Sequence, residues 1–254
     1  MKQRPSFPAR LDRTLAKNSP SANKAMLTPA VAVPQGLGMD SSAVRMRMVQ
    51  KLGQQGVRDP LVLSAMGTIE RHRFVVSALV NQAYEDTSLP IGLGQTISKP
   101  GVVSRMLELL RNGTTGKLGR VLEIGTGCGY QAAVLGMVAD EVYTIERLRG
   151  LHDKAHDNLR HLHLAHVHLL FGDGVEGYAK GAPYAGIIAA AGGESLPAAW
   201  IDQLAMGGRL VAPMVNPSAQ GNAQALIVVD KTPQGIRQTV LEPVHFVPLK
   251  SGVA

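Results

Sequence analysis

The residues best suited to chemistry are a glycine cluster flanked by two carboxylates. An apolar stretch leads into three alternating glycines in the run Val121-Leu122-Glu123-Ile124-Gly125-Thr126-Gly127-Cys128-Gly129-Tyr130. Glycines let the backbone approach a ligand where side chains would block it. Glu123 precedes the glycines, and Glu146 lies 21 residues after Gly125. The spacing predicts a ligand-binding turn between a buried strand and a helix.

The two carboxylates indicate which ligand this turn would take. The dinucleotide fingerprint is G-x-G-x-x-G, whereas these glycines are spaced G-x-G-x-G, which disfavours a nicotinamide oxidoreductase. A carboxylate at Glu123 suits a cationic amino group better than a pyrophosphate, and one at Glu146 can accept hydrogen bonds from both ribose hydroxyls. These features together predict S-adenosylmethionine as cofactor. A tight strand-to-helix connection without a ligand is the alternative that the glycine turn alone leaves open.

A second acidic turn lies further along the chain, in Gly172-Asp173-Gly174. Asp173 could accept a hydrogen bond from an adenine amino group, and Gly174 would leave room for the ring. An ordinary Asp-Gly turn explains this tripeptide equally well.

Bringing these turns together requires a sheet whose strands end at one edge. Beyond residue 119, apolar β-rich runs separated mostly by helix-length segments occupy residues 120–124, 141–145, 167–171, 185–191, 208–213 and 225–229. This alternation predicts an α/β fold with a doubly wound, mostly parallel sheet, in which the three acids lie at carboxyl ends of strands. A further run at 236–243 follows after a short turn, which predicts a C-terminal antiparallel hairpin at the sheet edge.

The segment before the sheet is predicted to be helical, and the chain start to be an extension. Apolar spacing and helix-start signals predict helices over residues 41–52, 60–69 and 100–110. Residues 1–40 hold five prolines and six basic side chains against two acidic ones, so four of the seven net positive charges lie there. We expect a disordered basic extension over 1–40, with Met39 as an alternative start. Residues 41–254 are predicted to form one domain, with 41–118 carrying the helices and active-site segment and 119–254 the cofactor-binding sheet.

Composition excludes several classes of protein. The chain of 254 residues is 45% hydrophobic and holds one cysteine, Cys128. No apolar run approaches the roughly 18 residues of a membrane-spanning helix. A lone cysteine forms no internal disulfide, which fits a reducing cytoplasm. Six histidines fall between 152 and 168, but no cysteine or paired carboxylate completes a ligand set, so no metal is expected. We expect a cytoplasmic monomer that needs neither nucleic acid nor a membrane.

One segment ahead of the glycine turn resembles a specific family. Leu89-Pro90-Ile91-Gly92-Leu93-Gly94-Gln95-Thr96-Ile97-Ser98-Lys99-Pro100 is similar to the signature segment of the bacterial protein-L-isoaspartate (D-aspartate) O-methyltransferases. The similarity spans about residues 43–254. Further matching stretches are Gly172-Asp173-Gly174, Ala182-Pro183-Tyr184, Gln203-Leu204-Ala205-Met206-Gly207-Gly208-Arg209-Leu210 and Phe246-Val247-Pro248-Leu249.

The resemblance implies a Rossmann-like class I methyltransferase. The implied activity is transfer of a methyl group from S-adenosylmethionine to the α-carboxylate of L-isoaspartyl residues in damaged proteins and peptides, which initiates repair through a succinimide. It also implies Ser98 as the active-site residue, with Thr96 and Ile97 beside it as substrate-binding residues. The implied cofactor contacts are Glu123, Gly125, Gly127, Glu146 and Asp173, and the glycine motifs add Gly129 and Gly174. Spacing alone would explain residues 95–98 as a Thr/Ser-capped turn before a helix.

Two departures from the family pattern keep other functions open. Family members usually carry an acid where this chain has Ala185, and they tend to have a different loop at 190–193. Both positions belong to the fourth strand region, which would flank the reaction site, so altered peptide binding or rate is expected. The alternatives are a methyltransferase acting on RNA or a small molecule, and a homologue that binds the cofactor without turnover.

Overall fold

The structure is a computed structural model that describes residues 42–216 and 223–254. The expected extension over 1–40 and the alternative start at Met39 lie outside the described residues. The helices are α1 Ser42–Gln54, α2 Pro60–Thr68, η1 Arg71–Phe74, η2 Ser77–Gln82, α3 Pro100–Arg111, α4 Tyr130–Val138, α5 Arg149–Arg160, η3 Ala179–Gly181 and α6 Ala198–Gln203. The strands are β1 Leu89–Gly92, β2 Gln95–Ile97, β3 Leu118–Ile124, β4 Ala139–Glu146, β5 Val167–Phe171, β6 Tyr184–Ala189, β7 Leu204–Val215, β8 Gln224–Thr232 and β9 Gly235–Val244.

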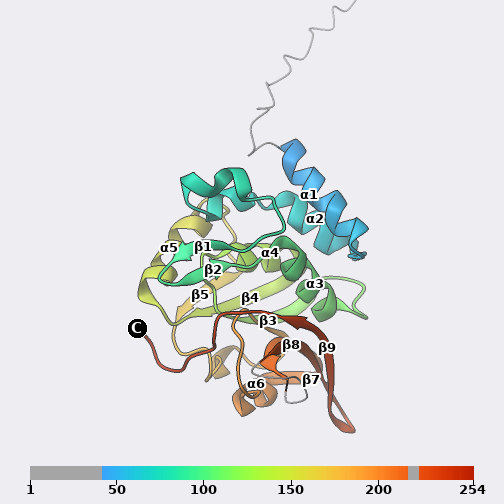
Figure 1. Cartoon of the computed structure of the whole chain (residues 1–254). Coiled ribbons are helices and arrows are strands. Elements are labelled where there is room, and N and C mark those ends of the chain that lie inside the picture. The colour runs from blue at the N-terminus through green and yellow to red at the C-terminus, as the bar shows by residue number, and fades with distance from the viewer. Residues whose placement is uncertain (1–41, 217–222) are drawn as a thin grey trace, which may run out of the picture. The chain divides into compact units, whose positions relative to one another are not determined.

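Seven strands form one sheet in the order β5-β4-β3-β6-β7-β8-β9 (Figure 1). The neighbours from β5 to β7 pair in parallel, and β8 and β9 pair antiparallel. The predicted mostly parallel α/β sheet and its antiparallel edge hairpin are therefore confirmed. The chain runs outward from β3 to β4 and β5, then returns to place β6 on the other side of β3. A reversal of this kind leaves a crevice at the carboxyl ends of the strands, where ligands bind.

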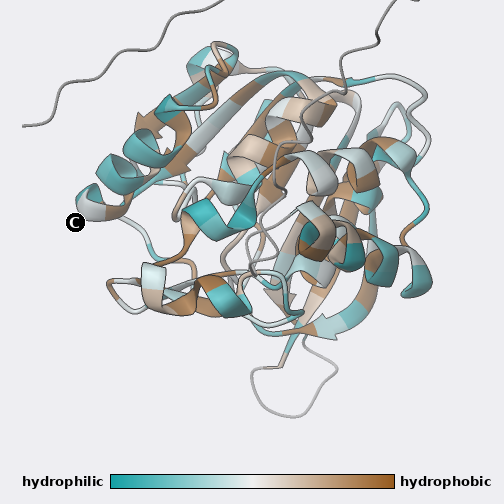
Figure 2. Cartoon of the chain, turned by 90° about the horizontal axis from the view of Figure 1, so that it is seen from above, coloured by the Kyte–Doolittle hydropathy of each residue, from teal (hydrophilic) through white to brown (hydrophobic). Residues whose placement is uncertain are grey.

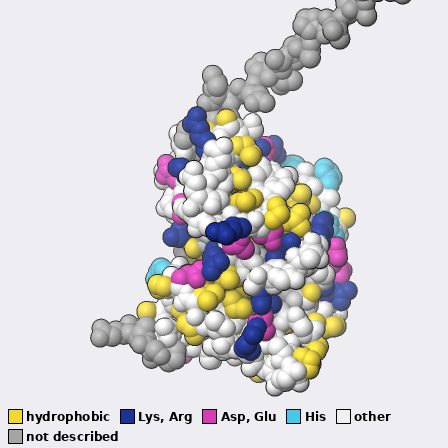
Figure 3. Space-filling view, turned by 90° about the vertical axis from the view of Figure 1, so that its right-hand side faces the viewer, with side chains coloured by type: hydrophobic (Ala, Val, Ile, Leu, Met, Phe, Trp, Pro, Cys, Tyr) yellow, Lys and Arg dark blue, Asp and Glu magenta, His cyan; other side chains and the backbone are white. Residues whose placement is uncertain are grey.

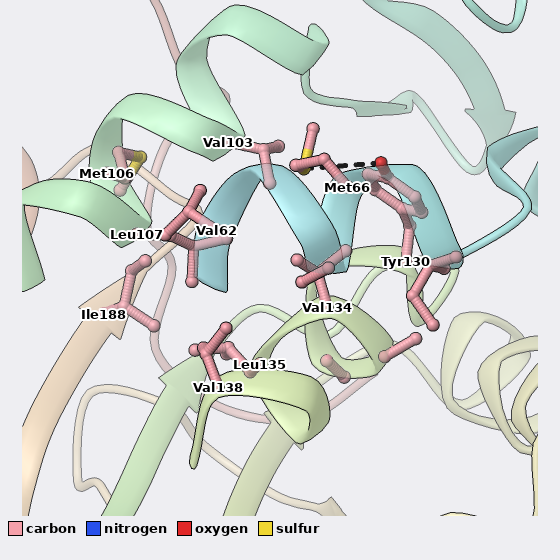
Figure 4. Close-up of a cluster of buried hydrophobic side chains, with 14 of the residues drawn as sticks. Val62, Met66, Val103, Met106, Leu107, Tyr130, Val134, Leu135, Val138 and Ile188 are labelled. Atoms are coloured by element: carbon pink, nitrogen blue, oxygen red, sulfur yellow. Dashed lines mark hydrogen bonds between the residues drawn. The ribbon is translucent and has the colours of Figure 1, made fainter. Parts of the chain in front are cut away.

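The sheet separates two hydrophobic cores because side chains alternate between its faces. Along β3, Val121 packs into a core with helices α1 to α5, whereas Leu122 packs into a core that includes Trp200 of α6. Figure 2 shows the central strands mostly hydrophobic and the outer helices with mixed faces. In the first core, side chains of α2, α3 and α4 converge, and the Tyr130 hydroxyl donates to the Met66 sulfur at 3.6 Å (Figure 4). This core fixes the start of α4, which follows the glycine turn.

The three predicted N-terminal helices are present with small shifts at their ends. The helix expected over 60–69 is α2, whose N-cap residue Asp59 accepts hydrogen bonds from Leu61 N and Val62 N. Arg111, at the end of α3, donates through Nε to Asp59 Oδ2 at 2.8 Å. Its guanidinium therefore joins the start of α2 to the end of α3. None of the helices within 42–216 and 223–254 is long and apolar enough to cross a membrane.

A two-stranded hairpin in the signature segment was not predicted. Strands β1 and β2 pair antiparallel between the helical region and α3. Their connection bends through Gly92, Leu93 and Gly94, with φ values of 102°, 51° and 69°. Positive φ is readily adopted by glycine and uncommon for leucine. The glycines on both sides of Leu93 were the signal for this turn.

Candidate functional site

A cavity of about 410 Å³ lies at the carboxyl ends of β3, β4 and β6. Its volume falls within the range of about 300–1,000 Å³ that is common for small-molecule sites. Seven of the ten residues that the sequence proposed line it: Thr96, Ile97, Ser98, Gly125, Gly127, Glu146 and Gly174. Glu123, Gly129 and Asp173 are not among its lining residues.

The glycine turn is shaped by its backbone conformation. Gly125, Gly127 and Gly129 have φ values of 89°, 58° and 90°, in the left-handed region that side chains other than glycine rarely adopt. Gly125 N and Thr126 N both donate to Ile145 O, at 2.9 and 3.1 Å. The alternating glycines are therefore required by the path of the chain itself, which holds the turn against β4. Gly125 and Gly127 face the cavity as a consequence of that path.

Glu146 is the carboxylate that faces the cavity. It ends β4 and is only 5% exposed. Its Oε2 accepts from Gly127 N and its Oε1 accepts from Leu148 N, both at 2.9 Å. These bonds fix the carboxylate, and each of its oxygens retains a second lone pair for a further donor. Glu146 can therefore hold the glycine turn and accept two hydroxyl groups of a ligand at the same time.

Glu123 lies behind the cavity wall and is wholly buried. The Thr144 hydroxyl donates to its Oε2 at 2.6 Å and is bonded in turn to the Thr126 hydroxyl. Burial raises the pKa of Glu123 to about 8, although the Thr144 hydroxyl and the Gln131 amide lower it. Its Oε1 and the Gln131 Nε2 are buried without a hydrogen bond to any described residue. Because Gln131 lines the cavity, it lies between this acid and any ligand.

Replacing Glu123 is expected to change how stability depends on pH. The pKa is about 8 in the folded protein and near 4.3 in an unfolded chain, so the folded state binds an extra proton between these values. Wild-type stability should therefore fall as pH rises from about 4.5 to 8. Glu123→Gln removes this pH-dependent contribution, so the free energy of unfolding of the variant, relative to wild type, should rise by about 4 kcal/mol over that range. Urea unfolding at pH 5 and pH 8 measures the difference, with the exposed Glu85→Gln as control. An equal difference at both pH values would contradict the assignment.

The signature segment forms another wall of the cavity. Ser98 lies between β2 and α3 and is half-buried, and the preceding Ile97 is 4% exposed. The Lys154 ammonium of α5 donates to Ile91 O of β1 at 2.8 Å. Asp86 Oδ1 accepts from Gly101 N at 2.7 Å, at the start of α3. These two bonds fix both ends of the segment that carries Ser98.

A second cavity of about 460 Å³ adjoins the first. Both cavities are lined by Thr96, Ser98, Ala190 and Val247. The second cavity extends from this common wall toward the end of β9. Ser98 therefore belongs to the wall that the two cavities have in common.

The C-terminal tail completes the first cavity, a role that the sequence did not predict. Residues 247–250 line the cavity. Further along the tail, Gly252 N donates to Asp173 Oδ2 at 2.5 Å, and Arg147 Nε donates to Gly252 O at 2.7 Å. Asp173 Oδ1 accepts from Val175 N at 2.8 Å. Both oxygens of Asp173 therefore bind backbone groups, where an adenine contact was expected. The only sequence signal for the tail was the family-like stretch Phe246-Val247-Pro248-Leu249.

Gly174 is required by packing as well as by its place in the wall. A Cβ added at Gly174 would lie 2.6 Å from Ile124 Cγ2, too close for any side chain. The residue therefore lets the loop after β5 approach the end of β3. The sequence analysis suggested that Gly174 leaves room for a ligand ring. Its close packing against Ile124 is a second reason for a glycine at this position.

The two departures from the family pattern lie at opposite ends of β6. Ala185 is the second residue of this strand, whereas the cavities lie beyond its last residue, Ala189. The fourth strand therefore flanks the site as expected, but only through its carboxyl end, and Ala185 lies at its other end, away from both cavities. Ala190 lines both cavities, and Gly192 pairs with Pro248 of the tail.

Restoring an acid at the distant position should leave activity unchanged. For the methyl transfer that the resemblance implies, we expect Ala185→Asp to keep kcat/KM within about twofold of wild type, because this half-buried position lines neither cavity. Initial rates with one methyl acceptor, together with a thermal unfolding curve, test this. A tenfold loss of activity in a fully folded variant would show that position 185 does influence the site.

The histidines between 152 and 168 do not gather into one cluster. His152 lies beside Asp153 on α5, whereas His168 lies 3.3 Å from Glu141 across the sheet. Over the residues that the structure describes, no group of three or more His, Cys, Asp or Glu could hold a metal ion.

Comparisons with known proteins agree with this arrangement. The family model for protein-L-isoaspartate(D-aspartate) O-methyltransferase matches residues 43–254. A Methylibium petroleiphilum protein named protein-L-isoaspartate O-methyltransferase is 52% identical and covers 98% of this chain and 96% of its own length. A Leptothrix cholodnii protein of the same name is 56% identical, covering 89% and 80%.

Solved structures show the same fold. A protein-L-isoaspartate O-methyltransferase superposes with a TM-score of 0.73 at 27% identity, covering 82% of this chain and 67% of its own. A Plasmodium falciparum chain named for the same methyltransferase class, crystallised with S-adenosyl-L-homocysteine, gives 0.70 at 22% identity, covering 81% and 98%. The chain therefore belongs to the protein-L-isoaspartate(D-aspartate) O-methyltransferase family.

Proposed function

We propose that this protein transfers a methyl group from S-adenosylmethionine to the α-carboxylate of L-isoaspartyl residues in damaged proteins and peptides. The observation that carries the proposal is the common wall of the two cavities, formed by Thr96, Ser98, Ala190 and Val247. One cavity would hold the methyl donor and the other the acceptor residue. The two reacting groups then meet beside Ser98.

The residues of the first cavity fit the donor. Glu146 has free lone pairs for two ribose hydroxyls, and Gly125 and Gly127 leave the turn open to a ligand. Glu123 lies close to the cavity-lining Gln131, so a cationic amino group bound at this part of the wall would lower the pKa of Glu123 and favour its charged form. When bound, S-adenosylmethionine supplies an electrophilic methyl group on a sulfonium.

The acceptor needs orientation more than activation. A carboxylate with a pKa near 4 is already ionised at pH 7, so no general base is required. Ser98 would donate a hydrogen bond to one carboxylate oxygen and direct the other toward the methyl group, with Thr96 and Ile97 shaping the wall. Alignment of two reactants can contribute roughly 7–11 kcal/mol to catalysis. Ser98 acts here as a hydrogen-bond donor, without a covalent intermediate.

A pair of peptides tests the function directly. Two peptides of one sequence, one with L-isoaspartate and one with L-aspartate, are incubated with the protein and methyl-labelled S-adenosylmethionine, and base-labile methyl ester is measured. We expect ester on the isoaspartyl peptide alone. Label transferred only to RNA or a small molecule would support the first alternative. Donor binding with no transfer to any acceptor would support the second, a homologue without turnover.

The protein acts, in this proposal, as a cytoplasmic monomer that needs neither nucleic acid nor a membrane. The small positive charge outside residues 1–40 and the lone Cys128 support this. Light scattering of the purified protein tests the monomer, and activity that persists after nuclease treatment tests its independence of nucleic acid.

A further inference from the structure

We propose that Lys99, assisted by His245, makes the acceptor cavity selective for isoaspartyl segments with acidic neighbouring side chains. This inference rests on the proposed function, since it names the class of peptide that the same site prefers. It concerns the second cavity, which begins at Ser98 and ends near residues 243–246.

The charge of this cavity has one sign. Among the residues that the structure describes, its titratable lining residues are Lys99 and His245, and no described aspartate or glutamate lines it. Both side chains are exposed, and neither forms a hydrogen bond or ion pair with a described residue. Two other lysines, Lys154 and Lys231, donate instead to backbone carbonyls. The Lys99 ammonium is therefore available to a bound peptide.

Two acids lie close to this cavity in the sequence, and each has a partner. Glu242, which precedes the lining residue Pro243, pairs with Arg105 at 2.8 Å. Asp86 accepts from Gly101 N at the start of α3. Arg105 therefore neutralises Glu242. The backbone hydrogen bond orients the Asp86 carboxylate but leaves its charge, and Asp86 is not among the residues that line the cavity.

The described surface carries charges of both signs. Figure 3 shows Lys and Arg side chains beside Asp and Glu side chains on the face that it views. Basic and acidic side chains also pair with one another, as Arg209 does with Asp230 and Arg105 with Glu242. A preference for acidic peptides must then arise locally, at Lys99, which directly follows Ser98 in the chain. Exposed charge pairs typically contribute about 0.2–1 kcal/mol, which corresponds to a preference of about two- to fivefold.

Three isoaspartyl peptides of one sequence test the selectivity. They carry Glu, Gln or Lys on both sides of the isoaspartate, and kcat and KM are measured for each at low salt. We expect wild type to favour the Glu peptide over the Lys peptide by about two- to fivefold, mainly through KM. Lys99→Gln should abolish the preference, and Lys99→Glu should reverse it. The same substitution at an exposed lysine of η3, Lys180→Gln, is the matched control and should keep the preference. His245→Gln should reduce it.

Several results would overturn the inference. Equal kcat/KM values of the wild-type protein for the three peptides would show that the cavity has no such selectivity. A uniform loss with all peptides in Lys99→Gln would mean that Lys99 contacts the reacting carboxylate or supports the fold. A preference that survives about 1 M salt would exclude an exposed charge as its cause, since the Debye length is then about 3 Å. Absence of methyl ester on every isoaspartyl peptide would instead overturn the proposed function, and this inference with it.

Discussion

Ser98→Ala is expected to lower kcat for methyl transfer to an isoaspartyl peptide by about 100-fold, in the range found when one positioned hydrogen-bond donor is removed from a reacting site. The hydroxyl lies in the wall between the two cavities, where it would orient the acceptor carboxylate. Without it the carboxylate can rotate away from the line of attack, and small misplacements are costly to rate. The affinity for S-adenosylmethionine should stay within about fivefold, since one neutral hydrogen bond contributes about 1 kcal/mol to binding.

The matched control for Ser98→Ala is Ser88→Ala. Ser88 lines the second cavity but not the first, so the same atom is deleted away from the common wall. We expect this control to retain most of its activity. Steady-state kinetics with the isoaspartyl peptide and calorimetric titration of the donor measure both quantities. Unchanged turnover in Ser98→Ala would show that the Ser98 hydroxyl has no role in the mechanism.

Glu146→Ala is expected to weaken donor binding by about 100-fold. Two hydrogen bonds from ribose hydroxyls to a charged acceptor would be lost, and such bonds contribute about 1.5–3 kcal/mol each before water compensates for part of the loss. The structure adds a second cause. Glu146 also accepts from Gly127 N, so the glycine turn loses the bond that fixes its shape. The dissociation constant of S-adenosylmethionine, measured by calorimetry, tests the prediction.

Two further variants separate these causes. Glu146→Gln keeps one carbonyl acceptor of the same shape and should bind the donor with intermediate affinity. Glu141→Ala removes a carboxylate from the amino half of the same strand, outside both cavities, and should bind the donor normally. Thermal unfolding without donor shows whether each variant is folded. Wild-type affinity in a folded Glu146→Ala would refute the placement of this carboxylate.

The sequence determined the sheet and the edge at which the ligand site lies. Apolar runs alternating with helix-length segments specify a parallel sheet, because each strand must bury both faces. The runs at 120–124 and 141–145 became β3 and β4 with slightly longer bounds. Gly125 and Glu146 were correctly expected at strand carboxyl ends, since their positions depend only on where each strand stops. The family resemblance added Ser98, which spacing alone would have left in a capped turn.

Only the tertiary structure decided which of these residues face the cavity and which lie behind it. Glu123 and Asp173 both lie at carboxyl ends of strands, as expected, but neither lines the cavity. Glu123 is bonded to Thr144 inside the sheet, and Asp173 is bonded to Gly252 of the tail. The tail is far from the glycine turn in sequence, so no local pattern could place it in the cavity wall. The distance of Ala185 from the site also depends on the fold, since the direction of β6 determines which of its ends reaches the site. Such contacts between distant segments depend on how the whole chain packs, whereas strands and turns depend on neighbouring residues.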